Sequence, residues 1–142
     1  LVFGQRGNDT LYGEHGDDQL FGGGHNDSII GGNGADTIVG GEGDDTLIAG
    51  KKGADILYGG DGYDVFVFEK GALDEAHNIS DYEYSHDVIR IVSNRYDSME
   101  DIVLAQAGDD VMVSYSHHMD PGTIRIQNTE LSNLSEQDFD FS

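Results

Sequence analysis

The chain has 142 residues and is strongly acidic, because 28 Asp and Glu residues against 7 Lys and Arg give a formal net charge of -21. It has no basic face of the kind that phosphate binding requires, so we expect no nucleic-acid partner. The sequence contains no cysteine, and no apolar run approaches the roughly 20 residues of a membrane span. Like charges at this density repel each other in a compact state, so we expect a bound cation.

The first 67 residues repeat with a period of nine, with one ten-residue step that we assign to an insertion at Ala49. The repeated aspartates are Asp9, Asp18, Asp27, Asp36, Asp45, Asp55 and Asp64. With aspartate as the sixth residue of each unit, the first residue is always glycine, and the fourth is glycine in all units except one, which has His25. The eighth residue is always apolar: Leu11, Leu20, Ile29, Ile38, Leu47, Leu57 and Phe66. This periodicity predicts a repeat architecture.

Each unit is predicted to form a tight turn followed by a short strand. Glycine at the first and fourth positions permits positive φ and close backbone approach. The last three residues place one apolar side chain inward between two outward ones, so two units form one coil of a parallel roll with strands about 4.8 Å apart. The core of such a roll is thin, and one apolar residue per unit does not offset about 1–2 kcal/mol of ordering entropy for each backbone residue.

The repeated aspartates are candidates for the missing stabilisation. In stacked coils each turn lies above the turn two units further on, so the sixth-position carboxylates converge along two edges of the roll. The expected pairs are Asp9–Asp27, Asp27–Asp45 and Asp45–Asp64 on one edge, and Asp18–Asp36 and Asp36–Asp55 on the other. Two carboxylates and several turn carbonyls form a hard, all-oxygen cage that suits Ca²⁺. About five ions would carry about ten positive charges and reduce the net charge of -21.

Residues 4–67 resemble the RTX, or haemolysin-type, calcium-binding repeat family, whose unit reads G-G-x-G-x-D-x-U-x. The clearest copies are Gly31–Val39 and Gly40–Ile48. The resemblance implies an all-β fold, a parallel β-roll, in which each ion takes the aspartates and also backbone carbonyls. One turn contributes the carbonyls of positions two and four, and the turn two units on contributes those of positions one and three. The implied carbonyl ligands are those of Gln5, Gly7, Glu14, Gly16, Gly22, Gly23, Gly24, His25, Gly31, Gly32, Asn33, Gly34, Gly40, Gly41, Glu42, Gly43, Gly50, Lys52, Gly59 and Asp61.

From Phe68 onward the glycine rule stops and ordinary strand alternation begins. We expect strands at 65–68, 87–92, 102–107, 111–115 and 123–127, and single helical turns at 98–101 and 135–138. A solenoid leaves its last coil open, so residues 68–142 are predicted to form a small β-rich C-terminal cap behind a roll of residues 1–67.

The C-terminal segment also resembles the end of proteins exported by type I secretion. The resemblance rests on Ile124–Gln127, on Leu131–Phe139 and on the acidic, aromatic finish Phe139–Phe141. It implies a secreted, extracellular bacterial protein that carries an uncleaved export signal and has the type I secretion machinery as a partner.

No catalytic constellation is visible, since the sequence lacks His-Glu-x-x-His and Gly-x-Ser-x-Gly. We interpret His117 and His118 as a solvated loop, and Asp109–Asp110 and Asp17–Asp18 as turn residues. The chain is therefore expected to be no enzyme. Two functions stay open: a calcium-triggered folding and export module, or a polysaccharide-binding module of the kind appended to alginate epimerases, which share this roll. The distal part of an RTX adhesin is a third possibility.

Overall fold

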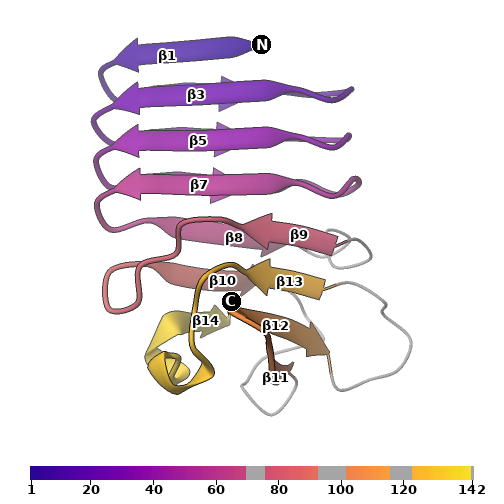
Figure 1. Cartoon of the computed structure of the whole chain (residues 1–142). Helices are drawn as coiled ribbons and strands as arrows, with labels where there is room; N and C mark the ends of the chain where they lie inside the picture. Colours follow the sequence, from indigo (N-terminus) through magenta and orange to yellow (C-terminus); the bar gives the residue numbers. More distant parts are fainter. Residues whose placement is uncertain (70–75, 93–101, 116–122, 142) are drawn as a thin grey trace.

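The computed structural model describes residues 1–69, 76–92, 102–115 and 123–141, and in them the chain winds as a parallel β-solenoid of about four turns (Figure 1). Each coil contributes one strand to each of two facing sheets. The first sheet receives β1 (Val2–Arg6), β3 (Gln19–Gly24), β5 (Thr37–Glu42) and β7 (Ile56–Asp61). The second sheet receives β2 (Thr10–Tyr12), β4 (Ser28–Ile30), β6 (Thr46–Ile48) and β8 (Val65–Glu69). The predicted all-β roll with two units per coil is therefore confirmed.

Both sheets of the roll are parallel and in register. Leu20 of β3 pairs with Ile38 of β5, and Ile38 pairs with Leu57 of β7. On the other sheet Ile29 of β4 pairs with Leu47 of β6. Equivalent positions of successive coils thus lie directly above one another, which stacks identical turn residues at the two edges.

The apolar eighth-position residues form the core between the sheets, as the sequence predicts. Their exposed fraction is at most 4%. The core continues without interruption past the repeats, through Phe68, Ile79, Ile89 and Ile91. These inward side chains hold the two sheets together, and the hydrogen bonds of the parallel ladders set the distance between the stacked turns.

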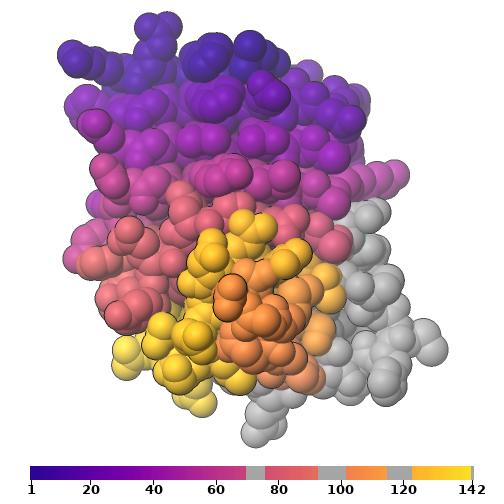
Figure 2. Space-filling model, in the orientation of Figure 1, coloured from indigo at the N-terminus to yellow at the C-terminus, as the bar shows by residue number. Residues whose placement is uncertain are grey.

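The C-terminal segment extends both sheets. Its strands are β9 (Ala76–Ile79), β10 (Val88–Val92), β11 (Ile102–Ala107), β12 (Asp110–Tyr115), β13 (Thr123–Ile126) and β14 (Phe139–Phe141). β9 pairs with β7 and β10 pairs with β8, all in parallel, so the last coil of the roll has neighbours on both sheets. Beyond them, β13 is parallel to β9, β14 is parallel to β10, and β11–β12–β13 form an antiparallel end. Figure 2 shows the atoms of this segment stacked directly against the end of the roll.

Most of the C-terminal predictions agree with the structure. The expected strands correspond to β8, β10, β11, β12 and β13, and the expected turn at the end of the chain is the 3₁₀ helix η4 (Glu136–Asp138), capped by Ser135. The strands β9 and β14 and the 3₁₀ helix η3 (Leu131–Asn133) were not predicted. The helical turn expected at 98–101 lies outside the described residues.

The predicted boundary at residue 67 falls inside β8, and both sheets pass it without a break. It therefore marks a change of sequence pattern within continuous sheets. The division into a roll of residues 1–67 and a cap of residues 68–142 stays a prediction about how the chain behaves. None of the helices in the described part of the chain is long or apolar enough to span a membrane.

Candidate calcium-binding turns

The turns of the repeats stack at two opposite edges of the roll. The chain leaves each strand of the first sheet at the same edge of the roll, which we call the first edge. Asp9, Asp27, Asp45 and Asp64 lie there. The second edge carries Asp18, Asp36 and Asp55. The structure thus groups the seven aspartates as the sequence predicts. They become more buried along the roll, since Asp9 and Asp18 are half-buried and the other five are at most 3% exposed.

Each sixth-position carboxylate reaches the backbone of the turn two units before it. The Asp9 amide donates to Oδ1 of Asp27 at 2.8 Å, and the Asp27 amide donates to Oδ1 of Asp45 at 2.7 Å. The same bond joins Asp18 to Asp36, Asp36 to Asp55 and Asp45 to Asp64, at 2.8–2.9 Å. These bonds show directly that the predicted pairs of aspartates are neighbours.

The second carboxylate oxygen, Oδ2, accepts no such hydrogen bond from a neighbouring turn. The Oδ2 atoms of Asp9, Asp27, Asp36, Asp45 and Asp64 are buried and have no hydrogen-bond partner among the described residues. Leaving a charged oxygen buried without a partner costs several kcal/mol, so buried charges are normally paired or bound to a metal. The orphaned oxygens are hard anionic donors, and they fit Ca²⁺.

Oδ2 lies beside the first-position glycine of its own turn, where a carbonyl oxygen of the following turn also approaches. A Cβ built on Gly40 would lie 2.3 Å from Oδ2 of Asp45 and 2.5 Å from the carbonyl oxygen of Gly59, which is the first residue two units on. The same two contacts recur at Gly22, with Asp27 and Gly40. At these positions Oδ2 and a carbonyl oxygen of the following turn thus both lie beside the same glycine. This close approach favours glycine at the first position.

Positive φ occurs at positions two and four, and position one does not need it. The fourth-position residues Gly7, Gly16, Gly34, Gly43, Gly53 and Gly62 all have φ of 100° or more. His25 occupies the same position with φ of 81°, so it adopts the glycine-like conformation that the sequence required of it. At position two, Gln5 and Glu14 also adopt positive φ, of 81° and 67°. Left-handed conformations are unfavourable for these residues, which store strain in the first coils.

The insertion lies at a different place from the one predicted. The carbonyl oxygen that faces Gly31 belongs to Ala49, and the Ala49 amide donates to Val67 as Gly31 donates to Ile48. Ala49 is thus the first residue of the sixth unit, and Gly50, with φ of 113°, is the second. The extra residue is Lys51, because Lys52 pairs with Asn33 at position three. The first-position carbonyl assigned to Gly50 therefore passes to Ala49.

The other candidate carbonyls lie between stacked turns. The third-position oxygens of Gly24, Asn33, Glu42, Lys52 and Asp61 accept hydrogen bonds of 2.6–3.1 Å from fourth-position amides two turns earlier. The second-position oxygen of Glu14 accepts from Asn33 at 2.9 Å. In the described part of the chain, no three His, Cys, Asp or Glu side chains are grouped to hold a metal by themselves. Carbonyl oxygens are thus needed to complete the coordination of any ion bound here.

Burial raises the pKa of several of these carboxyl groups. Desolvation is the largest cause, and it raises the pKa of Asp36 and Asp45 to about 6 and that of Asp64 to about 7. Neighbouring carboxylates raise these pKa values further, whereas the backbone hydrogen bonds lower them. The calcium-free roll therefore holds its anionic form at a substantial cost near neutral pH.

A second ladder, at position five, was missed by the sequence analysis. The side-chain oxygens of Asn8, Asn26 and Asp44 accept from the amides of the fifth residues two units later, at 3.0–3.3 Å. Asp17 does the same for Ala35 at 2.9 Å on the second edge. These bonds run in the opposite direction to the aspartate ladder, so stacked turns are clamped from both sides. The frequent Asn and Asp at position five was the available signal.

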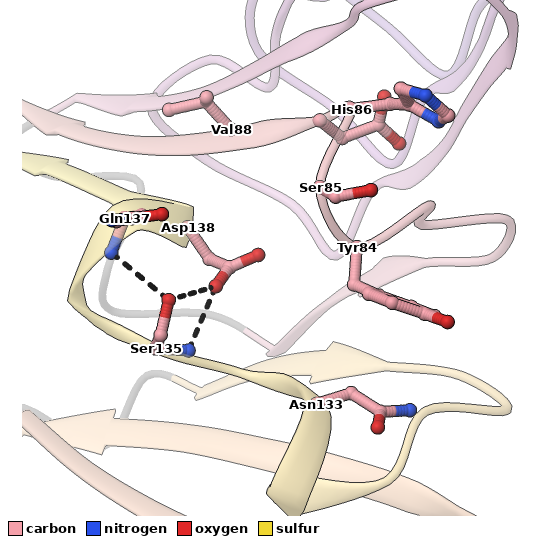
Figure 3. Close-up of a pocket in the computed structure, with 9 residues that line it drawn as sticks. Tyr84, Ser85, His86, Val88, Asn133, Ser135, Gln137 and Asp138 are labelled. Carbon is pink, nitrogen blue, oxygen red and sulfur yellow. Dashed lines mark hydrogen bonds between the residues drawn. The ribbon is translucent and has the colours of Figure 1, made fainter.

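A cleft of about 330 Å³ lies between the loop before β10 and the end of the chain (Figure 3). One wall carries Tyr84, Ser85, His86 and Asp87, and the other carries Asn133, Ser135, Gln137 and Asp138. The Asp138 carboxylate is occupied, because Oδ2 accepts from the amide and hydroxyl of Ser135, and Oδ1 lies 2.9 Å from the Tyr82 hydroxyl. The Asp138 carboxylate thus fixes the end of the chain to the loop before β10.

The remaining candidate residues have structural roles or lie outside the description. Asp110 accepts from Arg125 and from the Asn128 amide, and these bonds hold the pKa of its carboxyl below the usual range. The interpretation of Asp110 as a turn residue is wrong by one position, because Asp109 lies in the turn whereas Asp110 begins β12 and pairs with Ala107. His117 and His118 lie outside the described residues.

Comparison with known proteins agrees with this geometry. The RTX calcium-binding nonapeptide repeat matches the chain in four copies, over residues 1–29, 21–51, 30–66 and 47–72. Together these matches cover residues 1–72, just over half of the 142 residues. No curated protein matches the chain.

Two solved structures share the fold, both subunits of a mannuronan C5-epimerase from Azotobacter vinelandii. The AlgE6R3 subunit is 26% identical, with a TM-score of 0.66 over 89% of this chain and 79% of that one. The AlgE6R2 subunit is 20% identical, with a TM-score of 0.63 over 99% of this chain and 91% of that one, and shows the fold alone. The matched repeat family is a calcium-binding element, which fits the expected non-catalytic module. The chain belongs to the RTX calcium-binding nonapeptide repeat family and is a calcium-binding repeat module.

Proposed function

We propose that this chain is the calcium-dependent folding and export end of a secreted bacterial protein. Residues 1–67 form a roll that binds five Ca²⁺, two on the second edge and three on the first. Residues 68–142 form the cap of the roll and carry the signal that a type I secretion machinery reads. The roll folds outside the cell, where Ca²⁺ is abundant.

The observation that carries this proposal is the set of buried, partnerless Oδ2 atoms in the stacked turns. Without a cation, these carboxylates oppose folding, because they are desolvated and repel one another. With Ca²⁺, the same atoms become ligands that join neighbouring turns. Folding and ion binding are then a single process, as expected when the site does not exist in the unfolded chain.

Because the Ca²⁺ concentration is low in the cytosol and high outside the cell, coupling of folding to ion binding would delay folding until the chain has been exported. Extracellular-type sites bind Ca²⁺ with affinities of roughly 10⁻⁴–10⁻³ M, far weaker than the sites that function in the cytosol. Inside the cell the acidic chain would stay unfolded, which suits passage through a narrow exporter. Outside, each site stabilises the folded state by about 1.4 kcal/mol at a tenfold excess of Ca²⁺ over Kd.

An export assay tests the role of the cap. A passenger without its own signal is fused to this chain and expressed with a type I exporter, and its yield in the medium is compared with that of a fusion lacking Leu131–Ser142. The deletion should abolish export. A full-length fusion carrying Ile79→Ala, which loosens a 0% exposed side chain of β9 outside the deleted segment, controls for packing and should still be exported. Normal secretion of the deleted fusion would show that the signal lies elsewhere.

A polysaccharide-binding module is the second candidate, because the chain is 26% identical to a subunit of a mannuronan C5-epimerase. The net charge of -21 on this chain argues against the binding of an anionic glycan. Arg90 and Arg125 are ion-paired with Asp140 and Asp110, and the adjacent Lys51 and Lys52 lie exposed on the second edge. An alginate titration in Ca²⁺, with a Lys51→Glu, Lys52→Glu variant as the control, decides between the candidates. Saturable binding that the double variant loses would favour the glycan-binding module.

A further inference from the structure

The cap repeats the backbone register of a calcium turn on the first edge. The Val88 amide donates to the carbonyl oxygen of Asp64 at 2.9 Å, as the Val65 amide donates to that of Asp45. The Asp64 amide donates to Oδ1 of Asp87 at 3.0 Å, as the Asp45 amide donates to Oδ1 of Asp64. Asp87 therefore occupies the sixth position of a further turn, although the segment before it carries no glycine. We call residues 81–87 the cap turn.

Asp81 opens the cap turn at the level where a repeat has its first glycine. The Ser80 amide before it donates to Leu57 at 3.0 Å, which continues the ladder of the first sheet. The Asp81 carboxylate accepts from the amide of Gly59 at 2.8 Å and from that of Gly60 at 3.1 Å. A side-chain carboxylate thus approaches the last repeat turn from the side where the backbone of another repeat would lie.

Asp64 directs an unpartnered oxygen to the same place. It is 0% exposed, and its Oδ2 has no hydrogen-bond partner among the described residues. A Cβ on Gly59 would lie 2.2 Å from this atom, as one on Gly40 would lie 2.3 Å from Oδ2 of Asp45. The amide of the same Gly59 donates to the Asp81 carboxylate, so the unpartnered oxygen and the cap turn meet at this residue.

The three carboxylates lack a counter-charge. Asp87 is 4% exposed and Asp81 is half-buried. In the described part of the chain none of the three is ion-paired with Lys or Arg. Desolvation is the first cause that raises the pKa of each carboxyl, and the charges of Asp81 and Asp87 add to it at Asp64. A divalent cation would relieve both effects.

We propose that the junction between roll and cap holds a sixth calcium site, formed by the carboxylates of Asp64 and Asp87, while Asp81 fixes the backbone of the last repeat turn. By the rule of the repeat, the carbonyl oxygens of Gly60 and Gly62, at positions two and four, are the backbone ligands of the last turn. The proposal rests on the proposed function, which assigns five ions to the repeats. It adds that the cap is itself held to the roll through Ca²⁺.

On the second edge the row of aspartates ends at a histidine, in contrast to the first edge. There the Asn78 amide donates to Asp55 at 2.9 Å, so His77 holds the sixth position. Its Nδ1 lies 3.2 Å from both the amide nitrogen and Oδ2 of Asp55, and its ring packs 5.3 Å from Phe68. An imidazole stands where the next carboxylate would be, so the row of calcium sites ends at Asp55 on this edge.

Anomalous diffraction from crystals of the unchanged chain grown in Ca²⁺ tests the site directly. We expect a peak between Asp64 and Asp87 in addition to those at the five repeat pairs, and none between Asp55 and His77. Peaks at the repeats without one at the junction would overturn the sixth site and leave the proposed function standing. The absence of a peak at every turn would overturn both.

Counting bound ions by native mass spectrometry gives a second test. Asp87→Asn removes a carboxylate, keeps an acceptor for the Asp64 amide and loses the acceptor for the Glu83 amide, and it should bind one ion fewer than the unchanged chain. Asp44→Asn is the matched control, because exposed Asp44 accepts from the Tyr63 amide of the same last turn. The control should bind the full number. Equal numbers in Asp87→Asn and the unchanged chain would overturn the sixth site.

Discussion

The amide of Asp27 donates to Oδ1 of Asp45 at 2.7 Å, while Oδ2 of Asp45 is buried beside Gly40, where the carbonyl oxygen of Gly59 also approaches. One carboxylate therefore holds the turn before it with one oxygen and leaves the other without a hydrogen-bond partner among the described residues. In the proposed row of ions each interior aspartate serves two sites, so that the loss of one such aspartate would affect both.

Interior and terminal aspartates should therefore differ in how many ions they hold. Asp36→Ala removes the carboxylate that joins Asp18 to Asp55, so calorimetry should find about two fewer bound ions. Asp9→Ala lies at the beginning of its row and should lose one. Equal losses in the two variants would contradict the pairing of each turn with the turn two units on.

Gly40→Ala should destabilise the roll more than Gly7→Ala. In Gly40→Ala the added Cβ meets Oδ2 of Asp45 and the carbonyl oxygen of Gly59 at 2.3 and 2.5 Å, so proposed ligands must move. In Gly7→Ala nothing lies within 4 Å, and only the strain at φ of 112° remains. Urea unfolding at saturating Ca²⁺ should show a loss of about 1–2 kcal/mol for Gly7→Ala and of more than about 3 kcal/mol for Gly40→Ala. The reverse order would refute the role given to position one.

Much of this architecture could be predicted because the same residue pattern recurs in every repeat unit. Every eighth-position residue is apolar and every sixth is aspartate, so the coil, the core and the grouping of the aspartates follow from stacking alone. The hairpin of β11 and β12 follows in the same way from alternating residues on both sides of Gly108, whose φ is 70°.

Features that depend on single contacts could not be predicted. The insertion was assigned to Ala49 because Gly50 satisfied the glycine rule, yet the buried first position accepts Ala49 and the extra residue is Lys51. The strand β9 has the sequence Ala-His-Asn-Ile, and it is a strand because it pairs with β7 and β13. Asp87 carries no repeat signature and takes its place only through the fold.

Acid should stabilise the calcium-free roll. Burial raises the pKa of Asp36 and Asp45 to about 6 and that of Asp64 to about 7, above the usual value in the unfolded chain of about 4. Between about pH 4 and 7 the folded state thus binds more protons, and its free energy of unfolding rises as the pH falls. Calcium-stripped protein should therefore show more β-sheet circular dichroism at pH 5 than at pH 8.

The matched control for this effect is a variant with asparagine at 36, 45 and 64, whose β-sheet signal should depend less on pH. Protons and Ca²⁺ compete for the same oxygens, so the Ca²⁺ concentration that folds the unchanged chain should rise as the pH falls from 8 to 6. A calcium-free signal that is equal or weaker at pH 5 would contradict the assignment of these carboxyls as buried and short of a cation.

The central claim is that calcium binding and folding of the roll are one process, and a Ca²⁺ titration of the chelated chain at pH 7.5 tests it most directly. Far-ultraviolet circular dichroism and hydrodynamic radius are followed together, with Mg²⁺ as the control ion. The account predicts a largely disordered, expanded chain in EDTA, and β-sheet signal with a compact radius at millimolar Ca²⁺ but not at the same Mg²⁺ concentration. An EDTA-treated chain whose spectrum and radius equal those of the calcium-loaded chain would contradict it.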